Sequence, residues 1–131
     1  MMGCGMDLVE QLAGTWFVSG RHFHGEGILV ITPDGRVVQF QSAVKMPRKN
    51  ETLRLHVAAD VDGHLRFRRS PDDAGWLRGI EFSGPGWTMI AHENGEEFRF
   101  PCRHASAPFL PDWFEEQLAV NLDLLDARSC G

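Results

Sequence analysis

The chain has 131 residues, the size of a single domain that buries roughly two thirds of the surface exposed by its unfolded chain. Its 13 lysines and arginines against 18 aspartates and glutamates give a formal net charge of -5, which argues against binding to the phosphate backbone of nucleic acids. The longest aliphatic run, 28–31, is far shorter than the roughly 20 apolar residues of a membrane helix, and the start has no signal-peptide pattern. We therefore expect one cytoplasmic domain over residues 1–131, with neither nucleic acid nor a membrane as partner.

The three cysteines, Cys4, Cys102 and Cys130, are odd in number and have no metal-binding spacing. In a cytoplasmic protein this favours reduced thiols, with a disulfide between Cys102 and Cys130 as the alternative.

The first predicted element is a short helix that begins near Asp7 and ends at Gly14. Asp7 can cap the first turn, and Glu10 follows three residues later, as a capping box requires. Gly14 can adopt the conformation that ends a helix, so the chain then enters a strand.

Short segments rich in β-branched, aromatic and leucine residues follow, separated by turn sequences about ten residues apart. In the segment 52–58, Leu53, Leu55 and Val57 share one face, which indicates a strand with one apolar side. The spacing predicts about eight strands, at 15–23, 26–32, 36–44, 52–58, 64–69, 79–84, 87–92 and 96–102. Because all connections are short, antiparallel pairing in chain order is expected.

A longer helix is predicted over 112–127, where Asp112 and Glu115 form a second capping box. Its apolar stripe consists of Phe114, Leu118, Leu122 and Leu125. We expect the barrel wall or a second copy of the protein to cover this stripe, so a homodimer through this C-terminal helix is one expected arrangement.

A sheet of about eight antiparallel strands has exposed edges unless it closes into a barrel. A short helix, Gly14-Thr15-Trp16 entering the first strand, an up-and-down meander and a final helix resemble the lipocalins and the wider calycin group. The resemblance implies an all-β up-and-down barrel in which Trp16 closes one end and Gly14 allows a close turn. It also implies an arginine stacked on Trp16, for which Arg99 and Arg103 are candidates. The Thr-Asp-Tyr motif of that group is missing, because the chain has no tyrosine. Alternatively, Trp16 is an ordinary core residue.

Candidate metal and cofactor ligands are few. His22 and His24 would point the same way from a strand, but a protein site needs a third ligand, and no suitably spaced residue supplies it. Haem bound through one axial histidine, His56 or His92, is a further alternative. We expect neither a metal nor a cofactor.

No Ser-His-Asp pattern or phosphate-binding glycine loop is present, and we assign no catalytic residues. The polar strand faces could converge only if they pointed into the barrel, and we expect them to be solvated. They carry His56, Arg66, Arg68, Glu81, His92 and Arg99. A separate charged cluster is expected to pair locally across a hairpin; it contains Arg66, Arg68, Arg69, Arg78, Asp72 and Asp73.

The predicted function is the binding of a small hydrophobic or amphipathic molecule inside the barrel, driven by burial of its apolar atoms. The expected lining comes from the apolar strand faces: Val18, Val30, Leu55, Phe67, Phe82, Met89 and Phe100. Three alternatives remain open: a protein-interaction module with a filled barrel, a small enzyme of the isomerase or cyclase type, and a haem binder.

Overall fold

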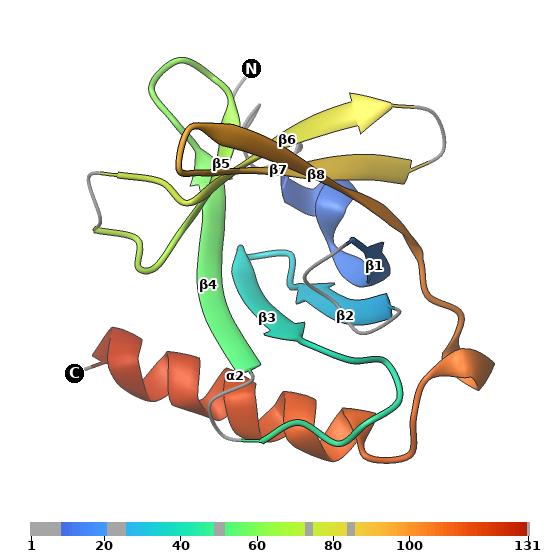
Figure 1. Ribbon diagram of the computed structural model, residues 1–131. Helices are drawn as coiled ribbons and strands as arrows, with labels where there is room; N and C mark the ends of the chain where they lie inside the picture. Colours follow the sequence, from blue (N-terminus) through green and yellow to red (C-terminus); the bar gives the residue numbers. More distant parts are fainter. Residues whose placement is uncertain (1–8, 21–25, 49–51, 73–74, 84–85, 131) are drawn as a thin grey trace.

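The computed structural model describes residues 9–20, 26–48, 52–72, 75–83 and 86–130, which form an eight-stranded barrel with a helix along one side (Figure 1). The strands are β1 (Gly14–Ser19), β2 (Glu26–Ile31), β3 (Arg36–Phe40), β4 (Thr52–Ala59), β5 (Leu65–Arg68), β6 (Arg78–Ser83), β7 (Gly86–Glu93) and β8 (Glu96–His104). Each strand pairs antiparallel with the next, and β8 pairs with β1 to close the barrel. The predicted all-β up-and-down barrel is confirmed.

The third strand is shorter than the predicted segment 36–44, because β3 ends at Phe40. The hydroxyl of Ser42 accepts hydrogen bonds from the backbone N–H groups of Val44 at 3.0 Å and Lys45 at 3.1 Å, which offers the backbone an alternative to the sheet. The N-terminal helix is confirmed over residues 9–12. Its expected cap, Asp7, and the expected strand end at 21–23 lie outside the described residues.

The hairpin between β7 and β8 shows how local sequence sets the register. Glu93 pairs with Glu96 across a two-residue turn of Asn94 and Gly95, whose φ angles are 54° and 82°. Positive φ at both positions is the signature of a type I′ turn, whose twist matches that of the flanking strands. Chain-order pairing therefore follows from turn chemistry of this kind.

The inward faces of the strands form one core. Its buried members are Val9, Leu12, Trp16, Val18, Leu29, Ile31, Val37, Leu55, Val57, Leu65, Phe67, Trp87, Met89, Phe100 and Cys102. Alternate residues of β4, β5 and β8 belong to this set, as their apolar alternation predicts.

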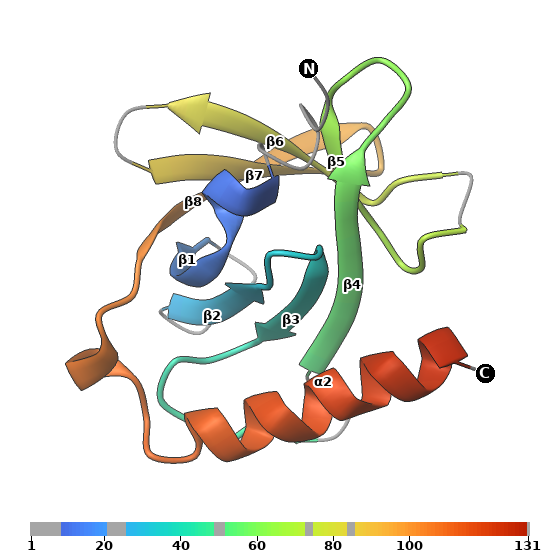
Figure 2. The same cartoon turned by 180° about the vertical axis from the view of Figure 1, so that it is seen from behind.

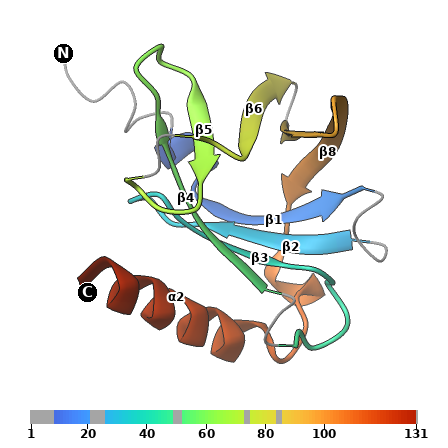
Figure 3. The ribbon, with the colours of Figure 1, turned by 60° about the vertical axis from the view of Figure 1, so that its left-hand side comes forward.

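A second core lies on the outer face of β1, β2 and β3, where α2 (Phe114–Cys130) packs across the strands (Figures 2 and 3). Its buried members are Phe17, Ile28, Val30, Val38, Phe40, Phe114 and Leu125. Because β2 and β3 are covered on both sides, their residues are buried without alternation, and β2 carries a continuous apolar run from Ile28 to Ile31. The barrel wall thus covers the stripe of the C-terminal helix. Whether two copies also associate through this helix stays a prediction.

Trp16, the residue predicted to close one end of the barrel, packs against the helix at 9–12. Its indole Nε1 donates a hydrogen bond to the carbonyl oxygen of Leu12 at 2.7 Å, and the Leu12 side chain is fully buried. Its ring also meets that of Trp87 edge to face, with centroids 5.7 Å apart. Gly14, the first residue of β1 after the helix at 9–12, has a φ of 136°, a conformation that favours glycine.

The ring stacked on Trp16 belongs to His104 rather than to an arginine. The two rings lie 4.0 Å apart at an interplanar angle of 28°. His104 is paired with Trp16 across β1 and β8, which places both side chains on the same face. Arg99 instead bonds Glu97, and Arg103 lies over Phe17, so neither candidate arginine stacks on Trp16.

Candidate functional site

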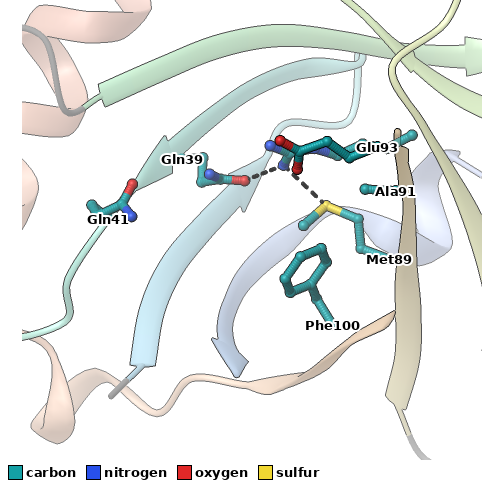
Figure 4. Close-up of a pocket in the computed structure, with 7 residues that line it drawn as sticks. Gln39, Gln41, Met89, Ala91, Glu93 and Phe100 are labelled. Atoms are coloured by element: carbon teal, nitrogen blue, oxygen red, sulfur yellow. Dashed lines mark hydrogen bonds between the residues drawn. The ribbon is translucent and has the colours of Figure 1, made fainter. Parts of the chain in front are cut away.

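The barrel is hollow at the end opposite to Trp16. Trp16 lies near the start of β1, whereas Glu93 ends β7, and odd-numbered strands of an up-and-down barrel run in the same direction. A cavity of about 250 Å³ opens at this second end. It is lined by Gln39, Gln41, Arg78, Met89, Ala91, Glu93 and Phe100 (Figure 4).

One wall of the cavity is apolar. Met89 and Ala91 reach it from β7, and Phe100 reaches it from β8, where it pairs with Met89. The Met89 side chain is fully buried, and that of Phe100 is 4% exposed. Figure 4 shows these two side chains beside each other, with Gln39 facing them from the other side. This wall can bury the apolar part of a small molecule.

The opposite wall carries hydrogen-bonding groups. Gln39 is a buried polar residue on β3, and Gln41 follows it at the same face. Glu93 lies at the mouth, where it is exposed. A cavity with one apolar and one polar wall suits a molecule that is itself amphipathic.

Arg78 places a positive charge inside the barrel. It begins β6 and pairs with Phe67 on one side and Ala91 on the other, so its side chain points inward with theirs. Its Nη1 donates to the Gln39 side-chain oxygen and, at 3.4 Å, to the Met89 sulfur. Burial lowers the pKa of this guanidinium below its ordinary value, yet an arginine keeps its charge in proteins.

The thiol of Cys102 lies in the same core but is not suited to nucleophilic chemistry. It is a free cysteine, 4% exposed, and burial raises the pKa of its thiol to about 12. A thiol with such a pKa is almost entirely protonated at neutral pH, and only the thiolate is reactive. The side chain of Cys130 lies outside the described part of the helix.

The predicted lining residues are divided among four places. Met89 and Phe100 line the cavity. Val18, Leu55 and Phe67 are fully buried and fill the barrel below it. Val30 lies on the outer face, in the core under α2, and Phe82 is 48% exposed at the closed end of β6. The barrel is therefore filled along most of its length and hollow at one end.

The polar strand faces point to solvent and are paired there. Arg66 contacts Asp62 at 3.3 Å and Arg68 contacts Asp60 at 2.7 Å, so these arginines pair with carboxylates of the turn between β4 and β5. Farther round the barrel, the arginine on β8 bridges two glutamates, in the contacts of Arg99 with Glu81 and Glu97. Asp73 lies outside the described residues.

The histidine candidates do not assemble a site in the described part of the chain. His22 and His24 lie outside it. His56 borders a depression on the outer face of β4, and the His92 ring meets Trp76 with centroids 6.3 Å apart. Among the described residues, no group of three His, Cys, Asp or Glu side chains is placed to hold a metal ion.

Sequence reasoning missed the polar members of the cavity, among them Arg78 and Gln39. Arg78 alternates with Ile80 and Phe82, and this spacing places it on the same face as those two apolar residues. That alternation could have indicated an inward-facing Arg78. Because Arg78 follows a charged turn, it was instead grouped with the charged residues that were expected to pair across a hairpin. Gln39 gave no signal, because its neighbours in β3 are buried on both faces.

Comparisons of the chain with protein-family models, curated proteins and solved structures give no match. Within the residues that the structure describes, no helix has the length and apolar character needed to cross a membrane.

Proposed function

We propose that the protein binds a small amphipathic molecule in the cavity at the open end of the barrel, in the manner of the lipocalin-like barrels that its chain resembles. The observation that carries the proposal is the division of this one cavity between an apolar wall at Met89, Ala91 and Phe100 and a polar wall at Gln39 and Arg78. The apolar part of the ligand lies against the first wall and its polar end against the second.

The size of the cavity limits the ligand. At about 250 Å³ it is smaller than the roughly 300–1,000 Å³ of pockets that enclose drug-sized molecules. The side chains of Phe67 and Leu55 fill the barrel beneath it, so a long chain cannot thread through to the closed end. A compact molecule with a short apolar segment fits these limits.

A series of neutral linear alcohols tests this proposal without involving charge. In titrations from 1-butanol to 1-decanol followed by two-dimensional NMR, each added methylene tightens binding about fourfold, the equivalent of about 0.8 kcal/mol, until the cavity is full. The amide shifts concentrate at residues around Ala91 and Phe100. Affinity that is independent of chain length, or shifts that centre on α2, would contradict the proposal.

Ala91→Leu provides the matching variant, because the larger side chain occupies the cavity from β7. We expect it to weaken 1-octanol binding by roughly tenfold or more, since it displaces the volume of about three methylenes. Ala58→Leu is the control: Ala58 is an exposed residue of β4 next to the inward-facing Val57, so its side chain points outward. Equal affinity of the two variants for 1-octanol would count against the cavity as the binding site.

A second candidate function, docking of a partner protein, has support from an exposed apolar area away from the cavity. Val44 is 81% exposed and Phe109, in the short helix η2 (Ala107–Phe109), is 74% exposed, and both border one surface depression. Exposed apolar patches of this kind are typical of interaction sites. Sedimentation analysis tests it: association that disappears in Phe109→Asp supports docking, and a monomer at all concentrations opposes self-docking there.

A further inference from the structure

The arginines of this barrel differ in the groups that their guanidiniums contact. On the outer surface, several arginines lie next to carboxylates: Arg36, Arg66, Arg68, Arg99 and Arg103. Arg78 differs from these five, because both acceptors that the structure gives it, the Gln39 amide oxygen and the Met89 sulfur, are uncharged. Arg54 also donates to a neutral group, Asn121 at 2.8 Å, but it lies beside α2 and does not line the cavity. Arg78, which points into the barrel, therefore lacks the carboxylate partner that these five arginines have.

Stability alone does not account for a cation at this position. Moving a charge out of water is costly unless an opposite charge and good hydrogen bonds compensate, and apolar residues of similar volume often serve a core as well or better. A methionine or leucine at position 78 would continue the apolar alternation of Ile80. A function that uses the charge explains the arginine better than packing does.

The geometry leaves hydrogen-bond donors directed at the cavity. A guanidinium has five N–H donors, and both bonds of Arg78 come from Nη1. Because the oxygen of the Gln39 amide accepts from Arg78, the amide nitrogen is the remaining polar group of that side chain, and it is a donor. Both residues line the cavity, so two donor groups, one from β3 and one from β6, face one space.

We infer that the ligand of this cavity is a monoanion, a small carboxylate whose head group is held by Arg78 and Gln39 while its apolar part lies against Met89 and Phe100. The inference rests on the proposed function and names the chemistry of its ligand. A carboxylate matches the planar fork of a guanidinium with two parallel hydrogen bonds. The exposed Glu93 at the mouth and the net charge of -5 disfavour a more highly charged anion.

Three probes of equal chain length separate the inference from the proposed function: octanoate, 1-octanol and octylammonium at neutral pH, measured by calorimetry. We expect octanoate to bind roughly 10 to 100 times more tightly than 1-octanol, because charge-assisted hydrogen bonds are stronger than neutral ones. Equal affinity for octanoate and 1-octanol, or a preference for octylammonium, would overturn the inference and leave the proposed function standing. Failure of all three probes to bind would overturn both. Octyl phosphate is the fourth arm, and tighter binding than octanoate would overturn the assignment of a carboxylate.

Arg78→Met removes the charge and keeps an apolar side chain of similar length. Its expected result is the loss of the octanoate preference: the affinity for octanoate falls by a much larger factor than that for 1-octanol, because a carboxylate loses charge-assisted hydrogen bonds and a hydroxyl loses only a neutral one. Arg78→Lys keeps the charge without the fork and should bind octanoate with intermediate affinity. A merely structural role for Arg78 would instead lower the affinity for both probes together, and that result would overturn the inference.

Gln39→Leu keeps the test decisive if replacement of Arg78 prevents folding. It removes the second donor while the guanidinium remains. We expect the affinity for octanoate to fall several-fold and that for 1-octanol to fall by a smaller factor, because hydrogen bonds to a charged group are stronger than neutral ones. An unchanged ratio between the two probes in this variant would exclude Gln39 from the head-group site and contradict the inference as stated.

Discussion

Replacement of Trp16 by phenylalanine is the sharpest test of how the barrel is closed. Trp16 is 3% exposed and makes three directed contacts: the hydrogen bond to the Leu12 carbonyl at 2.7 Å, the stack on His104 and the edge-to-face contact with Trp87. Phenylalanine cannot make the first of these, and its smaller ring leaves space beside Trp87.

The expected cost follows from these contacts. Removal of the indole N–H leaves a buried carbonyl of the 9–12 helix without its donor, which costs about 1–3 kcal/mol. The weaker stack on His104 and the unfilled volume add roughly 1–2 kcal/mol. We therefore expect Trp16→Phe to lower the free energy of unfolding by about 3 kcal/mol, a large share of the 5–15 kcal/mol of an ordinary domain.

Urea unfolding followed by far-ultraviolet circular dichroism measures this difference, with Trp113→Phe as the control. Trp113 also donates to a backbone carbonyl, that of Val44 at 3.1 Å, but in an exposed bond at the start of α2. The control should cost about 1 kcal/mol or less. If Trp16→Phe proves no more costly than Trp113→Phe, Trp16 is an ordinary core residue and the closure described above is refuted.

Two further predictions concern the cores. Burial raises the pKa of Cys102 in the folded protein to about 12, from an ordinary value of 9.0. Above the lower value the unfolded chain loses its thiol proton while the folded protein keeps it, so this stabilisation is complete below about pH 9 and declines toward the folded pKa. Between about pH 8 and about pH 10.5 the free energy of unfolding of the wild type, measured relative to Cys102→Ala, should fall by about 2 kcal/mol, and a pH-independent difference would refute the burial argument. The second prediction compares two neighbours on α2 by urea unfolding. Replacement of Leu125, which is 1% exposed, by alanine should lower the free energy of unfolding by about 2–5 kcal/mol. The same replacement of Leu124, which is 45% exposed, should change it by no more than about 0.5 kcal/mol. Similar costs at both positions would mean that α2 does not pack on the barrel as described.

The sequence was sufficient for the elements whose chemistry is local. Alternation in β4 and β8 and turn pairs such as Asn94-Gly95 specified strands, register and chain-order pairing. The apolar stripe of α2 likewise predicted a covered face. These features depend on residues a few positions apart, which is why they could be read without the fold.

Assignment to the inside or outside of the barrel failed where both faces are buried. In β2 every residue from Gly27 to Ile31 is buried, so nothing in the sequence distinguishes Leu29, which faces the core, from Val30, which faces α2. The sequence also does not predict how far along the barrel axis a residue lies. Phe82 points the same way as Ile80, but it lies at an exposed end of the barrel. His104 could be found as the partner of Trp16 only from the pairing of β1 with β8, the most distant pair in the chain.

The most direct test of ligand binding at the open end is an isotope-filtered NMR experiment on the protein with bound 1-octanol. We expect nuclear Overhauser contacts from the methyl and adjacent methylene protons of the alcohol to the Met89 methyl group and the Phe100 ring, and none to the Trp16 indole. Contacts to Phe114 or Leu125 under α2, or no contacts with the barrel interior at saturating alcohol, would contradict it.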